Sequence, residues 1–531
     1  MSLQRRIAAP RAAVWALLTV FAALGVIAAC VPVAGQDTGA ADARIGSSDV
    51  YTWDPARQSD SGTASVLAQV YDGLTAFDAD SNVRPDLART WQVDDSGQRI
   101  TFQLRPGAAY SDGTPIAAQD VVDSWLRLID PQNPSALASL LADVQGATDY
   151  QQGKADASAV GLHADGDRVI VDLRRSASYF LSVTASPSLA VVPPSIVSEI
   201  QSTPPTVVSG AYIPTAPSDG TIHLAANPQY WAGTPALANI DLVTDYGGTS
   251  GAQLFDQDQL DYTSIGSGDA SWISYDANLG PQLRQTDSFG LSYYGFNTTI
   301  APFDDSNVRR AFAEAVDWNR VVTLAGGTPA TSMVPPGVQG GDGQDHRPAY
   351  NVADAQALMA AAGFANGQNF PAVTLATYGV GYEQTVAKEL HDNLGVTVDV
   401  EALDFEDYLG LVANSRTPTL WALSWIADYP HAHDFLGLLL ETGSTSNTGK
   451  WSNARYDDLI AQAAATTDVD AQTALYSQAQ EILTQEVPAI PVSYDQSWAL
   501  SRNGLQGALQ SGVGLIRYAG MQWAPGTGSG Q

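Results

Sequence analysis

Segments with the residue period of a β-strand alternate with segments of helical period along most of this 531-residue chain. In residues 99–105 apolar and polar side chains alternate, as in a strand with one buried face. Three further segments repeat that pattern: 168–173, 221–224 and 396–400. Helical spacing predicts helices after Asp120 and Asp305, and over 355–362, 382–394, 454–465 and 471–483. The alternation predicts a mixed α/β protein without repeats or a long linker.

The charge balance excludes several classes of partner. The chain has 56 acidic and 25 basic residues, a net charge of −31. Nucleic acid and anionic membrane surfaces would repel it. One cysteine can form neither an internal disulfide nor a Cys-rich metal or iron–sulfur site. With 45% hydrophobic and 15% charged residues, the composition is globular, and the length predicts about three domains.

The first thirty residues have the pattern of an export signal. Arg5, Arg6 and Arg11 precede the apolar stretch 12–29, whose last residues are small and are followed by Cys30. A basic region, an apolar region and small residues in this order are typical of a secretory signal. The apolar-small-small-Cys pattern resembles a bacterial lipobox. We expect residues 1–29 to be removed and Cys30 to be acylated; ordinary secretion and a retained transmembrane helix are the alternatives.

Removal of this signal would make the remaining chain more acidic. Residues 1–29 contain three basic and no acidic residues, so the net charge would become −34. Residues 30–45 are small and polar, which predicts a flexible tether between the lipid and the fold. Membrane attachment would then depend on the acyl chains and a docking partner, because anionic lipid would not attract the chain.

Recognised catalytic motifs are missing from the sequence. It contains no G-x-S-x-G elbow, no H-E-x-x-H pair and no Walker loop. The one suggestive cluster is His431-Ala432-His433-Asp434. Two imidazoles two residues apart on a strand can share a metal, but no second His/Glu cluster accompanies them. A ligand contact and a plain loop are the other interpretations, so we predict no cofactor, no metal site and no enzymatic activity.

One aromatic segment indicates a binding site. In residues 424–430 (Ser-Trp-Ile-Ala-Asp-Tyr-Pro) a hydrophobic run ends in an acid, an aromatic residue and a proline. Such a strand end can present the Asp428 carboxylate at the rim of a cleft. The alternative is an aspartate that caps a turn. Core packing accounts for most of the 12 Trp and 21 Tyr elsewhere.

Taken in order, a series of motifs resembles the extracytoplasmic solute-binding proteins that deliver peptides and nickel to ABC importers, family 5. The resemblance extends from about residue 50 to the C-terminus. The matching segments are VYDGL at 70–74, LARTW at 87–91, TFQLRPG at 101–107, YSDGTP at 110–115, DVVDSW at 120–125, GAY at 210–212, NPQYW at 227–231, YGFNT at 294–298, PFD at 302–304, VRRA at 308–311, WSN at 451–453, YDDLI at 456–460 and PAIPV at 488–492. Segments 130–154 and 179–182 resemble the oligopeptide-binding branch.

The resemblance implies a bilobal α/β fold of the periplasmic binding-protein type (class II, cluster C). Two lobes joined by a two-strand hinge close on the ligand in such proteins. The implied domains are discontinuous: lobe I at 46–75, 207–298 and 490–531, an extra subdomain at 76–206, and lobe II at 299–489. The hinge would lie near 294–298 and 490–492, and the protein is expected to be a monomer.

The resemblance also implies site residues. In peptide-binding relatives the ligand lies extended between the lobes and pairs its backbone with a strand, here 423–427. The residue that matches the acid for the ligand α-amino group is Asp428, and a buried ammonium needs such a partner. The neighbouring contacts expected here are Ser424, Trp425, Ile426 and Tyr429. His431 and His433 stand where relatives have an Asp/Asn-x-Pro pattern, and only Arg347 and Arg416 are candidates for the ligand carboxylate.

The implied function is that of a non-catalytic lipoprotein at the extracytoplasmic face of the membrane. It would capture short peptides and deliver them to the permease and ATPase of an ABC importer. One alternative keeps the fold but has a nickel chelate, haem or glutathione as ligand, with His431 and His433 as contacts. Another is a surface sensor or regulatory lipoprotein without a role in transport.

Overall fold

A computed structural model describes residues 42–528 apart from residues 134, 198, 199, 201, 202, 380, 405, 406, 409 and 412–417. The predicted signal peptide, Cys30 and Arg416 lie outside the described residues, as does most of the predicted tether. The chain divides into two units, residues 1–39 and 40–531, and the fold below is that of the second unit. Within the described part, no helix has the length and apolar character needed to cross a membrane.

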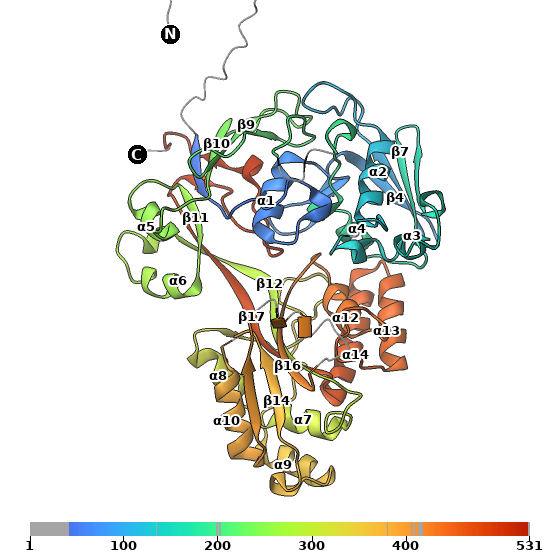
Figure 1. Cartoon of the computed structure of the whole chain (residues 1–531), viewed down its shortest axis with the longest axis vertical. Helices are drawn as coiled ribbons and strands as arrows, with labels where there is room; N and C mark the ends of the chain where they lie inside the picture. Colours follow the sequence, from blue (N-terminus) through green and yellow to red (C-terminus); the bar gives the residue numbers. More distant parts are fainter. Residues whose placement is uncertain are drawn as a thin grey trace, which may run out of the picture. The chain divides into compact units, whose positions relative to one another are not determined.

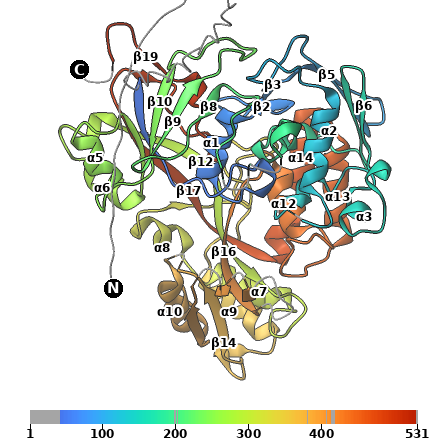
Figure 2. The ribbon, with the colours of Figure 1, turned by 45° about the horizontal axis from the view of Figure 1, so that its top comes forward.

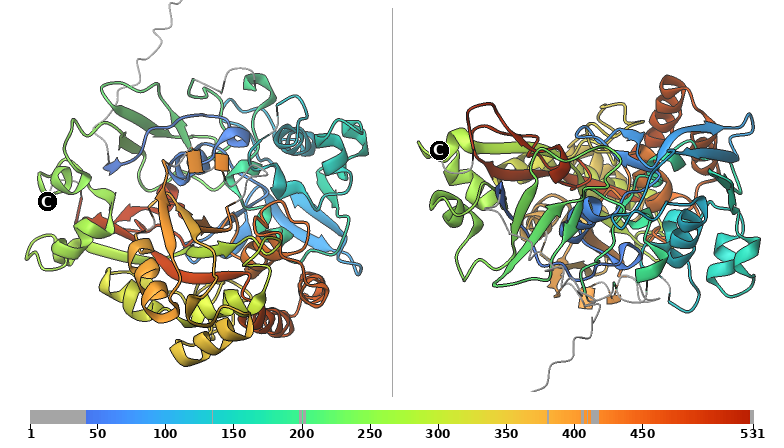
Figure 3. Two further views of the ribbon diagram at one scale, coloured as in Figure 1. Left: turned by 60° about the horizontal axis from the view of Figure 1, so that its bottom comes forward. Right: turned by 90° about the horizontal axis from the view of Figure 1, so that it is seen from above.

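A mixed eleven-stranded sheet forms the framework of this unit (Figure 1). Its strand order is β15-β14-β16-β12-β17-β11-β1-β10-β9-β8, with β13 paired to β17. The strands are β1 (Ala43–Gly46), β8 (Tyr212–Pro214), β9 (Thr221–Ala226), β10 (Asn239–Val243), β11 (Tyr262–Ile265), β12 (Leu283–Phe296), β13 (Thr328–Pro329), β14 (Val373–Thr377), β15 (Val398–Ala402), β16 (Leu420–Ile426) and β17 (Ala489–Ser501). The antiparallel pair β12 and β17 joins the two halves of the sheet and stays side by side in the other views (Figure 3).

A second, four-stranded sheet has the order β4-β5-β7-β6. Its strands are β4 (Ala88–Val93), β5 (Arg99–Leu104), β6 (Leu162–Asp165) and β7 (Arg168–Asp172). Helix α2 (Ala118–Leu128) buries Trp125 against this sheet, and the indole N–H of Trp125 donates to the Leu189 carbonyl at 2.8 Å. Two small hairpin-like pairs, β2 (Thr75–Phe77) with β3 (Val83–Pro85) and β18 (Leu505–Gln506) with β19 (Gln522–Trp523), complete the β structure.

The remaining helices cover these sheets. They are α1 (Ser61–Val70), α3 (Ala147–Gln151), α4 (Phe180–Val183), α5 (Gly251–Asp256), α6 (Ser267–Ile273), α7 (Ser306–Glu314), α8 (Trp318–Leu324), α9 (Val352–Ala361), α10 (Glu383–Leu394), α12 (Ala432–Leu440), α13 (Ala454–Ala465) and α14 (Val469–Glu486). Helices α12, α13 and α14 form one group (Figures 1 and 2). The Ser178 N–H donates to the Ala464 carbonyl at 2.8 Å, so this group contacts the segment before α4.

The structure confirms the mixed α/β prediction and most of its elements. Predicted strand 99–105 is β5, and predicted helix 454–465 is α13. The Asp305 carboxylate accepts the Asn307 N–H at 2.8 Å and caps α7, while Gly395 ends α10 with a φ of 73°. Strand β15 begins at Val398, two residues later than the predicted start at residue 396, and α14 is longer than predicted. The predicted hinge segment 294–298 covers the end of β12 and the two residues after it, and segment 490–492 lies in β17. The hinge itself and the domain bounds stay predictions.

Candidate functional site

Strand β16 has an unpaired edge at its C-terminal end. One side pairs antiparallel with β12 over its whole length, from Leu420 opposite Phe296 to Ile426 opposite Gly290. The other side pairs with β14 only at Leu420 and Trp421. Among the described residues no strand covers that side beyond Trp421. The edge can therefore accept another extended chain.

Two hydrogen bonds show which backbone groups face this edge. The Ser424 N–H donates to the Tyr378 hydroxyl at 3.1 Å, and the Tyr408 hydroxyl donates to the Ala422 carbonyl. Neither partner belongs to β12, so residues 422 and 424 point their backbone groups away from it. Backbone groups alternate along an antiparallel strand, so those of Ile426 point the same way. The Ser424 carbonyl and the Ile426 N–H and carbonyl thus lie along the edge.

Two carboxylates follow the end of β16. Asp428 is partly exposed, and burial raises its pKa from 3.8 to about 6. Asp434 is completely buried; its Oδ2 accepts the indole N–H of Trp425 at 2.7 Å and the Asp428 N–H at 3.3 Å. Burial, and then the Asp428 charge, raise the pKa of Asp434. Asp434 Oδ1 has no hydrogen-bond partner and neither acid has an ion-pair partner within the described part, so the site favours a cationic group.

The other residues predicted around Asp428 lie in different surroundings. The Ile426 side chain is 52% exposed, and Trp425 and Ser424 are half-buried, with Ser424 Oγ 2.7 Å from Ser292 Oγ. Tyr429 is buried, with its hydroxyl 2.9 Å from His433 Nδ1. Its ring stacks on Tyr179 at 5.8 Å. Tyr429 therefore belongs to a buried aromatic cluster, and its role as a pocket wall stays a prediction.

Both predicted histidines are buried in the same cluster. His431 Nδ1 accepts the His433 N–H at 3.1 Å and caps α12, and His431 Nε2 lies 3.0 Å from Gln472 Oε1. The His433 ring stacks on Tyr179 at 3.6 Å. Burial lowers both pKa values, that of His431 to about 4, so both rings are neutral at pH 7. Their role as ligand contacts stays a prediction, and their burial favours a structural role.

No described group of three or more His, Cys, Asp or Glu side chains could hold a metal ion. The buried aromatic cluster is instead bordered by ion pairs. Arg175 Nε lies 2.9 Å from Asp143 Oδ1, and its Nη1 lies 3.0 Å from Glu441 Oε1. The Tyr179 hydroxyl also donates to Asp143. Arg175 therefore connects the segment before α4 to the end of α12, a contact that the sequence did not indicate.

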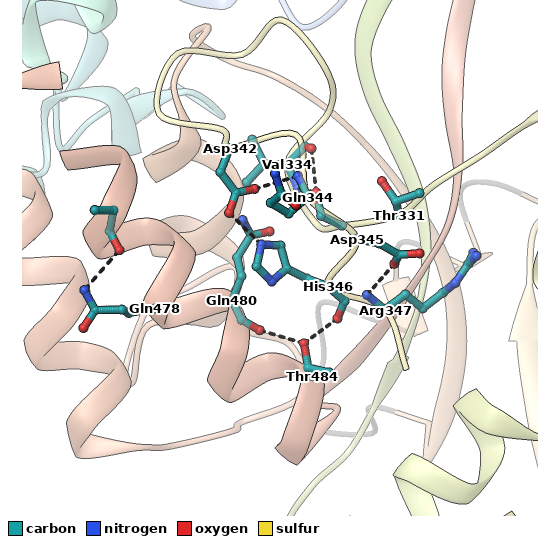
Figure 4. A network of polar contacts seen from close by, with 12 residues as sticks. Thr331, Val334, Asp342, Gln344, Asp345, His346, Arg347, Gln478, Gln480 and Thr484 are labelled. Carbon is teal, nitrogen blue, oxygen red and sulfur yellow. Dashed lines mark hydrogen bonds and ion pairs between the residues drawn. The ribbon is translucent and has the colours of Figure 1, made fainter. Parts of the chain in front are cut away.

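Arg347, the described candidate for a ligand carboxylate, lies in a buried loop network. Its backbone N–H donates to Asp345 Oδ1 at 3.1 Å, and nearby His346 Nε2 lies 2.8 Å from Asp342 Oδ2 (Figure 4). Arg347 Nη2 donates to Asn319 Oδ1 at 2.7 Å, and burial lowers the pKa of the guanidinium. Its Nη1 has no described partner, but Arg347 lies outside the walls of the two cavities below. Its role in carboxylate binding stays a prediction.

Two larger cavities lie near these elements. The first, of about 740 Å³, is lined by Ile426, by β17 residues and by segments around α6 and after α8. Its one charged wall residue is Asp495, which belongs to none of the motifs seen in the sequence. The second, of about 480 Å³, has a largely apolar wall with Phe77, Trp231 and Leu515. Its charged wall residues are two cations, Arg84 and Arg517, and two acids, Asp78 and Asp86. Either volume suits a small ligand.

Comparison with known proteins gives consistent matches over most of the chain. The model of the bacterial extracellular solute-binding proteins, family 5 Middle, matches residues 82–447. The probable deoxycholate-binding periplasmic protein of Escherichia coli K12 is 30% identical over 84% of this chain and 86% of its own length. The oligopeptide-binding protein of Bacillus subtilis 168 is 25% identical over 88% and 90%. The structure of the Escherichia coli murein tripeptide-binding protein has a TM-score of 0.73 at 25% identity, covering 90% of this chain and 97% of its own.

Proposed function

Because this chain belongs to the bacterial extracellular solute-binding proteins of family 5, we propose that it captures short peptides and delivers them to an ABC importer. Proteins of this family bind solutes for transport and are not enzymes, and their place is outside the cytoplasmic membrane. The family membership confirms the predicted bilobal fold. The peptide ligand and the residues that hold it are the proposal.

The observation that carries the proposal is the unpaired β16 edge that ends two residues before Asp428. An extended peptide would add a strand to this edge through the Ser424 carbonyl and the Ile426 N–H and carbonyl. Its α-amino group would then reach the Asp428 carboxylate, which lacks an ion-pair partner among the described residues. Backbone pairing gives affinity without reading side chains, which suits an importer of mixed peptides.

The names of several relatives support a peptide ligand. An oligopeptide-binding protein and a murein tripeptide-binding protein are both similar to this chain over most of their length. The test is calorimetry with tri- and tetrapeptides whose N-termini are free or acetylated. We expect acetylation to weaken binding more than tenfold, because it removes the ammonium that pairs with Asp428. Equal affinity for free and acetylated peptides would contradict the proposed mode.

We also propose that the protein acts as a lipid-anchored monomer. The lipobox-like segment before Cys30 supports the anchor, and a permease with its ATPase is the proposed partner. Metabolic labelling with a fatty acid tests the anchor: the wild type should incorporate label and Cys30→Ala should not. Equal labelling of both proteins would refute acylation at Cys30.

A second candidate ligand is an amphipathic organic acid such as a bile acid. One relative is named as a probable deoxycholate-binding protein, and the 480 Å³ cavity combines an apolar wall with Arg517; Arg84 in the same wall lies 3.8 Å from Asp86. Calorimetry with deoxycholate distinguishes the two candidates, because only this one predicts that Arg517→Ala weakens binding while Asp428→Asn does not. The metal-chelate alternative has less support, since His431 and His433 are buried in a packed cluster.

A further inference from the structure

The 740 Å³ cavity contains a carboxylate that no part of the proposed mechanism uses. Asp495 lies on β17 and is the one charged residue of the cavity wall, whose other members include seven serines and several small residues. No described residue forms a hydrogen bond or ion pair with it. Burial raises the pKa of this acid, and no nearby cation opposes that rise. A positively charged partner would stabilise the ionised form of a carboxylate in such surroundings.

The packing around Asp495 directs its carboxylate toward the end of β16. Gly290 of β12 lies opposite Ile426 of β16, so side chains at these two positions share one face of the sheet. A Cβ added to Gly290 would lie 2.3 Å from Asp495 Oδ2. The absence of a side chain at 290 thus leaves the space that the Asp495 carboxylate occupies. Ile426, 52% exposed, lines the same cavity beside it.

From this arrangement we infer that Asp495 receives a second positive group of the ligand, the lysine or arginine side chain of a basic peptide. The inference rests on the proposed function, because it places the ligand backbone on the β16 edge. A strand added there would lie about 10 Å from Gly290, which is two strand spacings. A lysine side chain of about 6 Å and a hydrogen bond of about 3 Å come within about 1 Å of that distance, and an arginine side chain of about 7 Å with the same hydrogen bond covers it. Its aliphatic part would cross the exposed Ile426 side chain.

The position of the basic residue in the peptide follows from the same geometry. The α-amino group lies at Asp428 in the proposed mode, and Ile426 precedes Asp428 by two residues. A peptide with its N-terminus at Asp428 runs antiparallel to β16, so its second or third residue lies opposite Ile426. The side chain of the residue opposite Ile426 points to the face that carries Asp495. The ligand class is therefore a short peptide with Lys or Arg at position two or three.

The test compares two peptides by calorimetry: Ala-Lys-Lys-Ala and its neutral form with norleucine, which lacks only the terminal ammonium, at both lysines. Wild type should bind the lysine peptide about ten- to a hundredfold more tightly. Asp495→Asn should remove that preference and change the affinity for the norleucine peptide less than threefold. Asp287→Asn is the matched control, because Asp287 is an exposed acid on β12 outside the cavity wall. It should leave both affinities unchanged.

Each other outcome has a defined meaning. Equal affinity of the wild type for both peptides would overturn the role of Asp495 and leave the proposed function intact. The same holds if Asp495→Asn loses affinity for both peptides equally while its melting temperature is unchanged. A similar loss of preference in Asp287→Asn would assign the effect to net charge and would also overturn it. Failure of folded wild type to bind either peptide would reject the proposed function and this inference with it.

Discussion

Replacement of Asp428 by asparagine should have opposite effects on the free protein and on the complex. Burial raises the pKa of Asp428 from 3.8 to about 6, so the charged form is less stable in the fold than in the unfolded chain. Each pKa unit corresponds to about 1.4 kcal/mol, which gives a cost of at most about 3 kcal/mol at pH 7. Partial solvent exposure of the side chain lowers this to about 1–3 kcal/mol. Asp428→Asn removes the charge and should stabilise the ligand-free protein by that amount.

The sign of the pH dependence follows from the same shift. Between pH 4 and pH 6 the folded protein holds a proton on Asp428 that the unfolded chain has lost. The stability contribution of Asp428 therefore falls as pH rises through this interval and is constant above it. Asp428→Asn should remove this part of the slope. Its melting temperature at pH 7 should rise by about 1–3 °C, since about 490 folded residues have an unfolding entropy near 1 kcal/mol/K.

The complex should respond in the other direction. Loss of the carboxylate leaves the ligand ammonium without its charged partner, which should weaken peptide binding more than tenfold. Thermal unfolding between pH 4 and pH 8, with calorimetry at pH 7, measures both effects. Asp287→Asn is again the control, because it removes the same charge at an exposed position. A less stable Asp428→Asn protein, or one that binds peptide as tightly as wild type, would refute the reasoning.

Three further predictions concern the same region. Peptide affinity should fall up to tenfold per pH unit below pH 6, as Asp428 takes up a proton, and calorimetry of Asp428→Asn should show no such slope. Ile426→Pro removes an edge N–H and should weaken binding at least fivefold, whereas Ile426→Val should not, with equal melting temperatures as the check of folding. Arg175→Ala removes the ion pairs to Asp143 and Glu441, while Arg174 Nη2 stays 2.8 Å from Asp143 Oδ1, and should lower the free energy of unfolding by about 1–2 kcal/mol in denaturant titration; no change would contradict the ion-pair assignment.

Local patterns predicted the elements well because their causes are local. The alternation in residues 99–105 reflects one buried face of β5, and the polar residues around 454–465 reflect the solvent side of α13. Two helix ends could be predicted for the same reason, since the Asp305 cap starts α7 and the left-handed Gly395 ends α10 through contacts within one turn. The predicted boundaries of β15 were two residues off, because the residues of this strand are those that pair with β14, and that pairing is a tertiary contact.

The site was less predictable because its defining contacts join distant residues. The resemblance directed attention to Asp428, but the free edge before it depends on where β14 stops pairing with β16. Tyr429 and His433 are buried because Tyr179, some 250 residues earlier, stacks on them. Asp434 belongs to the His-Ala-His-Asp segment 431–434, but the sequence does not show that its side chain is buried and not solvated. Asp495 had no local signal, since the space for its carboxylate depends on Gly290 of the neighbouring strand β12.

The two acids Asp428 and Asp495 suggest how affinity would arise in the proposed binding mode. Asp428 and Asp495 are both destabilised by burial and lack ion-pair partners within the described residues, so the ligand-free fold is less stable than it would be with neutral side chains. A ligand that brings one or two cations relieves this cost on binding. The carboxylates are already in place, so little ordering is required at that step. The net charge of −31 acts in the same direction, because it attracts cationic ligands and repels anionic ones before contact. In the proposed binding mode, the long-range field and the short-range contacts would therefore both favour ligands that carry positive groups.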